Sequence, residues 1–367
     1  MKIVVTGSNG FIGKNLCIML REHGCNDIVE VDRDTSRNAL SEHLGCADFV
    51  YHLAGINRPK DECEFHLGNA DLTSFITQEL KARGKKIPLV ISSSTQAEID
   101  NAYGISKRLA EQAVELYAKD TGAPYVIYRF PNVFGKWCRP NYNSFVATFC
   151  YNILNGIDIT INDPFSPVTL VYIDDVCSSL IALLDGAVSS GFKKVSPEYP
   201  TTVGEVADFL KAFRDSRENL VTENVGAGLT RALYATYLSY MSPAQFSYSI
   251  PSYGDERGVF SEVLKFKEAG QFSFFTAHPG ITRGGHYHHS KNEKFLVLKG
   301  TALFKFEHIA TGEHYEFQTN GSSPQIVETV PGWSHDVTNI GDEEMIVMLW
   351  ANEVFDREAP DTFSHPL

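Results

Sequence analysis

The chain has 367 residues, of which 43% are hydrophobic and 21% charged, so it is long enough for two globular domains and has no bias toward disorder. Its formal net charge of −13 argues against nucleic acid or anionic membranes as partners. The seven cysteines include no CxxC pair, and no apolar run has the length of a membrane span or the form of a signal peptide, so we expect a cytoplasmic protein with reduced thiols.

Short apolar runs alternate with helical periodicity through the first half of the chain. Strands are expected at Ile3–Val5, Asp27–Val31, Phe49–Leu53, Leu89–Ser92 and Tyr125–Arg129. Helical spacing of apolar residues begins at Ile12 and recurs over Arg108–Tyr117. This alternation predicts an α/β fold of the Rossmann type, which is a doubly wound parallel sheet with helices on both faces.

The texture of the sequence changes after about Pro243. The strands expected there are short and rich in Phe, Val and Ile: Phe272–Thr276, Lys294–Leu298, Ala302–His308, Gln325–Val330 and Met345–Trp350. Breaks at Gly, Pro, Asn and Asp are typical of a small antiparallel β-barrel or sandwich. The sequence thus predicts two domains, residues 1–243 and 244–367, with the polar stretch Asp215–Ser242 as the connector.

A glycine-rich turn follows the first expected strand and opens the first expected helix. Gly7 suits the tight turn, Gly10 permits close approach of a pyrophosphate, and Gly13 permits close packing of helix on strand. The free N–H groups at the start of the helix then face the anion. The residues expected to contact a dinucleotide cofactor are Gly7, Asn9, Gly10, Phe11, Ile12, Gly13, Asp32, Arg33, Leu53, Ala54, Gly55, Tyr103 and Lys107.

Asp32 and Arg33 lie at the end of the second expected strand, where dinucleotide enzymes distinguish NAD from NADP. An acidic side chain there binds ribose hydroxyls and favours NAD, whereas an arginine pairs with a 2′-phosphate and favours NADP. Both residue types are present, so this position leaves the choice open.

Tyr103 and Lys107 are four residues apart, so they lie on one face of a helix. An ammonium group beside a phenol lowers the pKa of the phenol, which would let Tyr103 pass a proton to a carbonyl oxygen near neutral pH. The serine cluster Ser92–Ser94 ends a strand and supplies a hydroxyl that can polarise the same oxygen. Ser94 is the first candidate and Ser93 is the alternative.

Six motifs in order resemble the extended short-chain dehydrogenase/reductase family, whose members act mainly on nucleotide-linked sugars. They are TGSNGFIG from Thr6, HLAG from His52, SSS from Ser92, YGISK from Tyr103, RFPNVFG from Arg129 and VYIDDV from Val171. The resemblance implies that Tyr103 is the general acid, assisted by Lys107 and Ser94. It also implies that the side chains in contact with substrate are Asn132, Trp137, Arg139, Asn141 and Tyr142.

His286, His288, Glu293 and His335 form a pattern typical of a metal site in a barrel. The imidazoles of an HxH strand point to the same side. A glutamate on the next strand can meet them, and a later histidine on a strand across the barrel completes the set. Both segments resemble the two cupin motifs, which implies a cupin (jelly-roll) barrel with a divalent metal. Zinc is the first choice, with nickel, iron or manganese as alternatives, and His289 is the expected outsider.

The stretches from Asp255 to Glu262 and from Arg283 to His286 also resemble the deoxysugar 3- and 3,5-epimerases, which share the cupin fold. In that family the histidine that matches His286 is the base that removes a proton beside a keto group. At this stage His286 is therefore either a metal ligand or a base. Asp255 and Arg257 are either functional residues or an ordinary salt bridge.

Over its whole length the chain resembles bacterial enzymes of capsular polysaccharide synthesis that fuse the two modules. That resemblance implies a homodimeric, bifunctional enzyme with NADP(H) and zinc. Its barrel would invert C3 of a UDP-2-acetamido-2,6-dideoxy-4-keto-hexose, and its reductase would reduce C4 to a UDP-N-acetyl-6-deoxy-talose, toward UDP-N-acetyl-L-fucosamine and capsule or O-antigen polysaccharide. One alternative is an NAD-retaining nucleotide-sugar epimerase or dehydratase with a structural, dimerising cupin. The other is a non-catalytic redox sensor.

Overall fold

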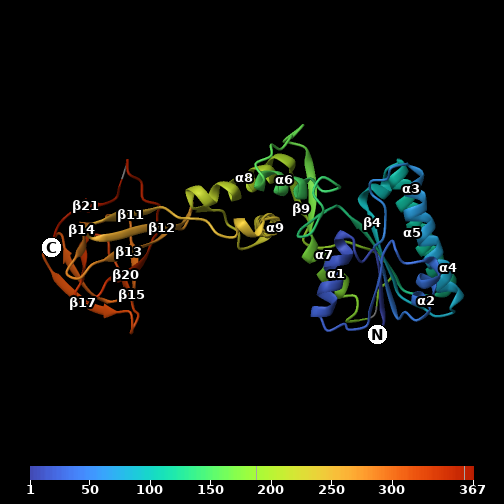
Figure 1. Cartoon of the computed structure of the whole chain (residues 1–367), viewed down its shortest axis with the longest axis horizontal. Helices are drawn as coiled ribbons and strands as arrows, with labels where there is room; N and C mark the ends of the chain where they lie inside the picture. Colours follow the sequence, from blue (N-terminus) through green and yellow to red (C-terminus); the bar gives the residue numbers. More distant parts are fainter. Residues whose placement is uncertain (187, 359) are drawn as a thin grey trace. The chain divides into compact units, whose positions relative to one another are not determined.

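The computed structural model describes residues 1–186, 188–358 and 360–367 (Figure 1). The chain divides into two compact units. The first is Met1–Leu210 with Arg231–Met241, and the second is Lys211–Thr230 with Ser242–Leu367. Among the described residues, no helix combines the length and the hydropathy that crossing a bilayer requires.

The first unit is built on a six-stranded sheet in which every strand pair is parallel. The strand order is β2 (Ile28–Val31), β1 (Ile3–Thr6), β3 (Phe49–His52), β4 (Leu89–Ser94), β5 (Tyr125–Phe130) and β8 (Gly191–Lys193). Helices cover both faces (Figure 1): α1 (Phe11–Glu22) and α7 (Ile173–Ile181) on one, and α2 (Arg37–Gly45), α4 (Leu72–Ala82) and α5 (Ala102–Thr121) on the other. The strand order reverses between β1 and β3, and ligands of doubly wound folds bind at such a switch point.

The apolar composition of the strands explains this layering. All four residues of β1 and all four of β3 are buried, as expected for strands covered on both faces. One core contains Val4 and Val50 of the sheet together with Leu44 of α2, Ile76 of α4 and Val114 of α5.

The first unit also contains α3 (Cys63–Phe65), the π-helix η1 (His66–Asp71), the 3₁₀ helix η2 (Thr95–Glu98), α6 (Phe145–Leu154), and a three-stranded sheet of β6 (Asn132–Phe134), β7 (Pro167–Tyr172) and β9 (Tyr199–Thr202). Of these, η2 lies directly between β4 and α5, and so between the serine cluster and Tyr103.

The predicted connector is structured and does not belong to one unit. α8 (Val203–Asn219) leads into β10 (Val221–Thr222), which pairs with β12 of the second unit. Most of α9 (Gly228–Leu238) lies in the first unit, where Leu233 and Tyr237 are buried.

The second unit consists of two sheets whose strand pairs are antiparallel, apart from the parallel pair β10–β12. After the 3₁₀ helix η3 (Pro243–Gln245), the first sheet has β11 (Ser252–Asp255) beside β12 (Gly258–Phe266), then β13 (Gly270–Ala277), β20 (Met345–Ala351), β15 (Glu293–Lys299) and β18 (Ile326–Glu328). The second sheet is β17 (His314–Asn320), β16 (Thr301–His308), β19 (Trp333–Asn339), β14 (Thr282–Tyr287) and β21 (Phe363–Ser364).

Aromatic and branched side chains from both sheets form one shared core, with Phe275, Phe295 and Val347 from the first sheet and Phe304 and Val337 from the second. The predicted fold class, an α/β doubly wound sheet followed by an all-β barrel, is confirmed.

Candidate active sites

The glycine-rich turn between β1 and α1 leaves no room for side chains. Gly7 has a φ of +72°, and a Cβ at that position would lie 2.7 Å from the backbone nitrogen of Ala54. A Cβ at Gly13 would lie 2.1 Å from the carbonyl oxygen of Gly7. Three backbone segments therefore meet closely where the N-terminus of α1 presents its free N–H groups, an arrangement suited to a pyrophosphate.

A cavity of about 1490 Å³ opens at this turn. Its lining includes every residue that the sequence predicts to contact the cofactor. Four of the five predicted substrate residues line the same cavity: Asn132, Trp137, Arg139 and Tyr142. Asn141 lies outside the lining, and its backbone N–H donates to Thr148 Oγ1 at 3.0 Å.

Tyr103 and Lys107 lie on one face of α5, as their spacing predicts, and Lys107 Nζ is 5.9 Å from the centroid of the Tyr103 ring. The ammonium group of Lys107 donates to the carbonyl oxygen of Ser92 at 3.1 Å. The hydroxyl of Tyr103 donates to Asn57 Oδ1 at 2.9 Å. Asn57 also lines the cavity, and the sequence contains no motif that would have singled it out.

The pKa of Tyr103 moves opposite to the sequence-based expectation. Burial raises the pKa of Tyr103, and a hydrogen bond with the side chain of Ser94 partly opposes that rise. Burial also lowers the pKa of Lys107 to about 8, although the Glu111 carboxylate favours its charged form. The reason is that both side chains are screened from water, and desolvation disfavours the charged forms of a phenol and of an amine alike.

The two serine candidates have different surroundings. Ser93 is buried and donates to Glu111 Oε1 at 2.5 Å. Ser94 begins the 3₁₀ helix η2 by accepting from the N–H of Gln96 at 3.1 Å, and its side chain interacts with Tyr103. Ser94 is thus the serine whose hydroxyl faces the proposed acid.

Glu111 is a second residue that the sequence reading missed. It is 2% exposed, and it accepts from Arg129 Nε at 2.9 Å and from a terminal Arg129 nitrogen at 2.6 Å. These contacts tie α5 to the ends of β4 and β5. The i,i+4 spacing from Lys107 was a signal that could have identified Glu111.

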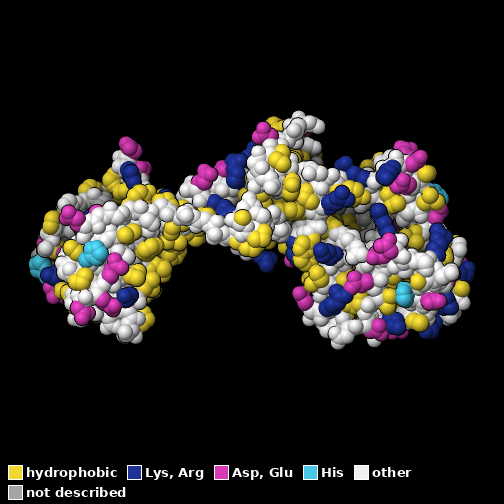
Figure 2. Space-filling view, in the orientation of Figure 1, with side chains coloured by type: hydrophobic (Ala, Val, Ile, Leu, Met, Phe, Trp, Pro, Cys, Tyr) yellow, Lys and Arg dark blue, Asp and Glu magenta, His cyan; other side chains and the backbone are white. Residues whose placement is uncertain are grey.

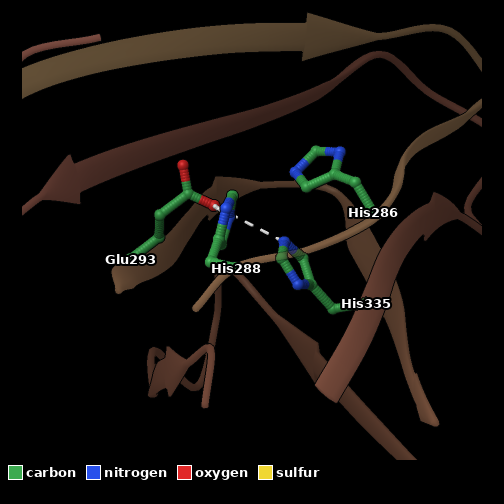
Figure 3. Close-up of side chains that lie close together, drawn as sticks. All are labelled: His286, His288, Glu293 and His335. Atoms are coloured by element: carbon green, nitrogen blue, oxygen red, sulfur yellow. Dashed lines mark hydrogen bonds and ion pairs between the residues drawn. The ribbon is translucent and has the colours of Figure 1, made fainter. Parts of the chain in front are cut away.

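The four predicted metal ligands come together in the second unit (Figure 3). His286, His288, Glu293 and His335 each offer one ligand atom, and these atoms all lie within 4.8 Å of one another. Glu293 Oε2 is 3.4 Å from His288 Nε2 and 3.5 Å from His335 Nε2. His289 is not part of the group, because its ring packs against Phe363 instead.

The arrangement of strands behind these ligands differs from the expectation in one respect. His335 was predicted on a strand across the barrel, but β19 is the direct neighbour of β14, and His286 and His335 are paired residues. Glu293 is the residue that comes from the opposite sheet, at the start of β15. A register shift after Gly284 makes this pairing possible, because the shift turns His286 toward the interior.

The donor set fits a divalent cation. Both ring nitrogens of His335 are buried without a hydrogen-bond partner among the described residues, which is costly unless something else satisfies them. Burial alone would raise the pKa of Glu293, but the neighbouring His288, His335 and Lys291 side chains together outweigh it and hold that pKa well below its usual value. Burial and the neighbouring His335 lower the pKa of His286 to about 4. Neutral imidazoles and an ionised carboxylate are the forms that bind a metal.

Asp255 and Arg257 form a salt bridge, which is one of the two alternatives that the sequence left open. Arg257 donates to Asp255 Oδ2 at 2.5 and 3.0 Å. These bonds lower the pKa of Asp255 to about 2. The guanidinium of Arg283 lies 4.0 Å from the same carboxylate and over the ring of Phe275.

Two family models match the chain. Residues 3–192 match the NAD dependent epimerase/dehydratase family, and residues 253–363 match the polysaccharide biosynthesis C-terminal domain. Among characterised proteins, the UDP-2-acetamido-2,6-beta-L-arabino-hexul-4-ose reductase of Pseudomonas aeruginosa is 55% identical over 99% of this chain and 98% of its own length. UDP-glucuronic acid decarboxylase 1 of Danio rerio is 23% identical over 60% of the chain and 62% of its own.

Comparison with solved structures agrees with the comparison of sequences. The capsular polysaccharide assembling protein CapF of Staphylococcus aureus is 40% identical, with a TM-score of 0.92 over 100% of both chains. A UDP-glucuronic acid 4-epimerase of Bacillus cereus is 19% identical over 65% of this chain and 96% of its own, with a TM-score of 0.57, which shows a shared fold over that part. The chain belongs to the NAD-dependent epimerase/dehydratase family, within a branch of nucleotide-sugar enzymes that carry a polysaccharide biosynthesis C-terminal domain.

Proposed function

We propose that this chain reduces the 4-keto group of a UDP-2-acetamido-2,6-dideoxy-4-keto-hexose with NADPH, after its barrel has inverted C3. The product would be a UDP-N-acetyl-6-deoxy-talose, toward UDP-N-acetyl-L-fucosamine and a surface polysaccharide. The observation that carries the proposal is the single cavity that holds the glycine-rich turn, Ser94, Tyr103 and Lys107. The full-length similarity to a reductase of that substrate class supports the choice of sugar.

In the reductase the protein supplies positioning and a proton. Ser94 and Tyr103 would hold the C4 carbonyl oxygen, and the Tyr103 hydroxyl would donate its proton to that oxygen. Lys107 would keep a positive charge beside the phenol as the proton leaves. A bound nicotinamide supplies the hydride. For Tyr103 to reach the substrate, its hydroxyl must exchange Asn57 Oδ1 for the keto oxygen.

Three side chains support NADP(H) over NAD. The Asp32 carboxylate accepts from Asn9 Nδ2 at 2.5 Å and from the N–H of Asp34 at 3.0 Å, which leaves it less available for ribose hydroxyls. Arg33 and Arg37 also line the cavity and are exposed. Two guanidinium groups favour a 2′-phosphate.

In the barrel, His286, His288, Glu293 and His335 would hold a zinc ion. A divalent metal bound there would polarise the keto oxygen and so acidify the proton on C3. We assign His286 to the ligand set because its ring lies 4.8 Å from that of His335 and 5.1 Å from that of His288. The sequence also left open the role of base for His286, and Zn²⁺ binding by His286→Ala distinguishes the two roles.

We also propose a cytoplasmic homodimer. Hydrophobic side chains gather on the second unit where β13, β20 and β15 lie (Figure 2). An apolar groove there is lined by Phe272, Leu296, Ile326, Met348 and Trp350, which point away from the core because alternate residues of a strand face opposite sides. All seven cysteines are free, which suits a reducing compartment.

The test is oxidation of NADPH with the enzymatically prepared UDP-4-keto-6-deoxy-N-acetylhexosamine in deuterated water, followed by product NMR. The proposal expects NADPH consumption and deuterium at C3. Consumption without deuterium would remove the epimerase from the proposal and leave the reductase. No consumption, together with NAD bound to the purified protein, would favour the NAD-retaining epimerase or dehydratase.

A further inference from the structure

The C-terminal segment Asp361–His365 holds the strands that carry the metal-site histidines. Its strand β21 pairs antiparallel with β14, which bears His286. The N–H of His365 donates to the carbonyl of Gly285 at 2.8 Å. The carbonyl of His365 accepts from Ser334 Oγ, next to His335, at 2.5 Å. The segment therefore bridges the two paired strands on which two of the four ligands lie.

The side chain of Asp361 holds the loop between the ligand-bearing strands β14 and β15. Its Oδ1 accepts from the N–H of His289 at 2.9 Å. Its Oδ2 accepts from the N–H of Ser290 at 2.7 Å, the N–H of Lys291 at 2.8 Å and Ser290 Oγ at 2.9 Å. Three consecutive N–H groups thus point at one carboxylate. This loop leads from His288 to Glu293, so its shape sets the distance between those two ligands.

The backbone of Asp361 fixes the orientation and tautomer of His288. His288 Nδ1 lies 2.5 Å from the carbonyl oxygen of Asp361, with the ring 1% exposed. A carbonyl only accepts, so Nδ1 carries a proton, and Nε2 is the ring nitrogen left to bind a metal ion. Nε2 faces Glu293 Oε2 at 3.4 Å. The Asp361 carbonyl therefore turns the metal-binding nitrogen of His288 toward the glutamate of the same site.

We propose that Asp361 is a positioning residue of the metal site, acting through His288 and through the loop to Glu293. The inference rests on the proposed metal site and adds a residue 68 positions beyond Glu293 in the chain, outside both histidine motifs. Partners that orient a metal-ligating histidine typically change metal affinity by about 10- to 100-fold when they are removed.

The experiment compares Asp361→Asn with the unchanged full-length chain, after both have been stripped with a chelator. Zn²⁺ affinity is measured by competition with a chromophoric chelator, and the Co²⁺-loaded protein gives the ligand-field absorption bands. Asp361→Asn keeps the backbone carbonyl that contacts His288 but turns an acceptor of the Ser290 and Lys291 N–H groups into an amide NH₂, so the loop and that carbonyl must shift. We expect the variant to bind Zn²⁺ about 10- to 100-fold more weakly and to shift or weaken the Co²⁺ bands at full occupancy. Asp356→Asn is the matched control. It removes an exposed carboxylate that accepts from the N–H of Glu358, and it should match the unchanged chain in both readouts.

Each result bears on a distinct claim. If Asp361→Asn melts earlier without metal but keeps the Zn²⁺ affinity and the Co²⁺ bands, its role is only structural and the inference is overturned. Equal weakening by Asp356→Asn overturns it as well, since general loss of negative charge would then be the cause. If the unchanged chain binds neither ion, the proposed metal site fails, and the positioning role fails with it. The NADPH oxidation test of the reductase is unaffected by any of these results.

Discussion

Tyr103 is the side chain on which the proposed reduction depends most directly. Its hydroxyl donates to Asn57, and burial raises its pKa, so it is protonated at neutral pH and able to act as an acid. We expect Tyr103→Phe to lower the rate of NADPH oxidation about 10²- to 10⁴-fold, the usual contribution of a general acid. Cofactor binding, measured by quenching of protein fluorescence, should not change. If Tyr103→Phe kept near-normal turnover, another group would have to donate the proton to the keto oxygen.

Lys107 predicts a pH dependence of stability with a definite sign. Its pKa is lowered in the fold to about 8, so its charged form destabilises the folded state relative to the unfolded state. Below about pH 8, Lys107 is protonated in both the folded and the unfolded state. Burial of its charge then lowers the free energy of unfolding by an amount on the order of 3 kcal/mol. As the pH rises from about 8 toward the unfolded value, the folded state loses its proton first, and stability rises.

Comparing the chain with Lys107→Met isolates this effect. The melting temperature of the unchanged protein, minus that of Lys107→Met, should increase between about pH 8 and pH 10. Tyrosines and cysteines titrate in both proteins and cancel in the difference. Parallel curves would mean that Lys107 is not desolvated in solution as it is in the structure.

A variant of His286 can show whether this residue binds the metal ion or removes the proton from C3. If it is a ligand, as its place in the group of four suggests, then His286→Ala should weaken Zn²⁺ binding and also abolish deuterium incorporation at C3. His289→Ala is the control, because its ring packs against Phe363 and lies outside the group. Retained Zn²⁺ with lost deuterium incorporation would identify His286 as the base instead.

At the scale of elements, the close packing of β1 on α1 makes its own prediction. A Cβ at Gly13 would lie 2.1 Å from the carbonyl oxygen of Gly7, which a rigid backbone cannot accommodate. Gly13→Ala should destabilise the protein by about 1–3 kcal/mol and weaken cofactor binding, because α1 must move away from the turn. Gly226→Ala is the control, since no atom of the described residues lies within 4 Å of the added carbon. Calorimetry and cofactor titration measure the two effects, and equal behaviour of the two variants would contradict the packing argument.

The elements that the sequence predicts best are those with strong local signals. Strands β1 to β5, the YxxxK helix α5 and the histidine-bearing strands follow from apolar runs and fixed spacings. The contacts between the Asp361 carboxylate and the loop at Ser290 were not predictable. They join residues about 70 positions apart through backbone groups that have no sequence pattern. The Asn57 contact and the neighbouring placement of β14 and β19 likewise depend on tertiary arrangement.

The same reasoning applies to the pKa of Tyr103. Its spacing from Lys107 predicted a lowered pKa, but burial, which sequence spacing does not report, has the larger effect. Residue types and intervals therefore identified the members of both sites, whereas solvent exposure and long-range hydrogen bonds decided their properties.

At the scale of the whole molecule, each unit has hydrophobic core packing of its own. One core of the first unit contains residues from Val4 to Ile127, and a core of the second contains residues from Phe275 to Leu349. The predicted boundary between residues 243 and 244 remains a prediction. A chain cut there would leave β10 without its partner β12. A cut after residue 210 would divide α8 and remove Arg231–Met241, whose Leu233 and Tyr237 are buried in the first unit. We therefore expect neither cut to give a stable first unit.

Because the two units pack separately, we expect that C3 epimerisation and C4 reduction can be catalysed by two different molecules of the protein. Tyr103→Phe keeps the barrel residues intact, and His286→Ala keeps the reductase residues intact. An equimolar mixture should therefore form the C3-inverted, C4-reduced product that neither variant forms alone, after a lag while the keto intermediate accumulates in solution. Product NMR at C3 and C4 measures the outcome, and each variant alone shows that its remaining half-reaction works. If both half-reactions proceed but the mixture yields no such product, the intermediate is not released, and reduction must follow epimerisation on the same molecule.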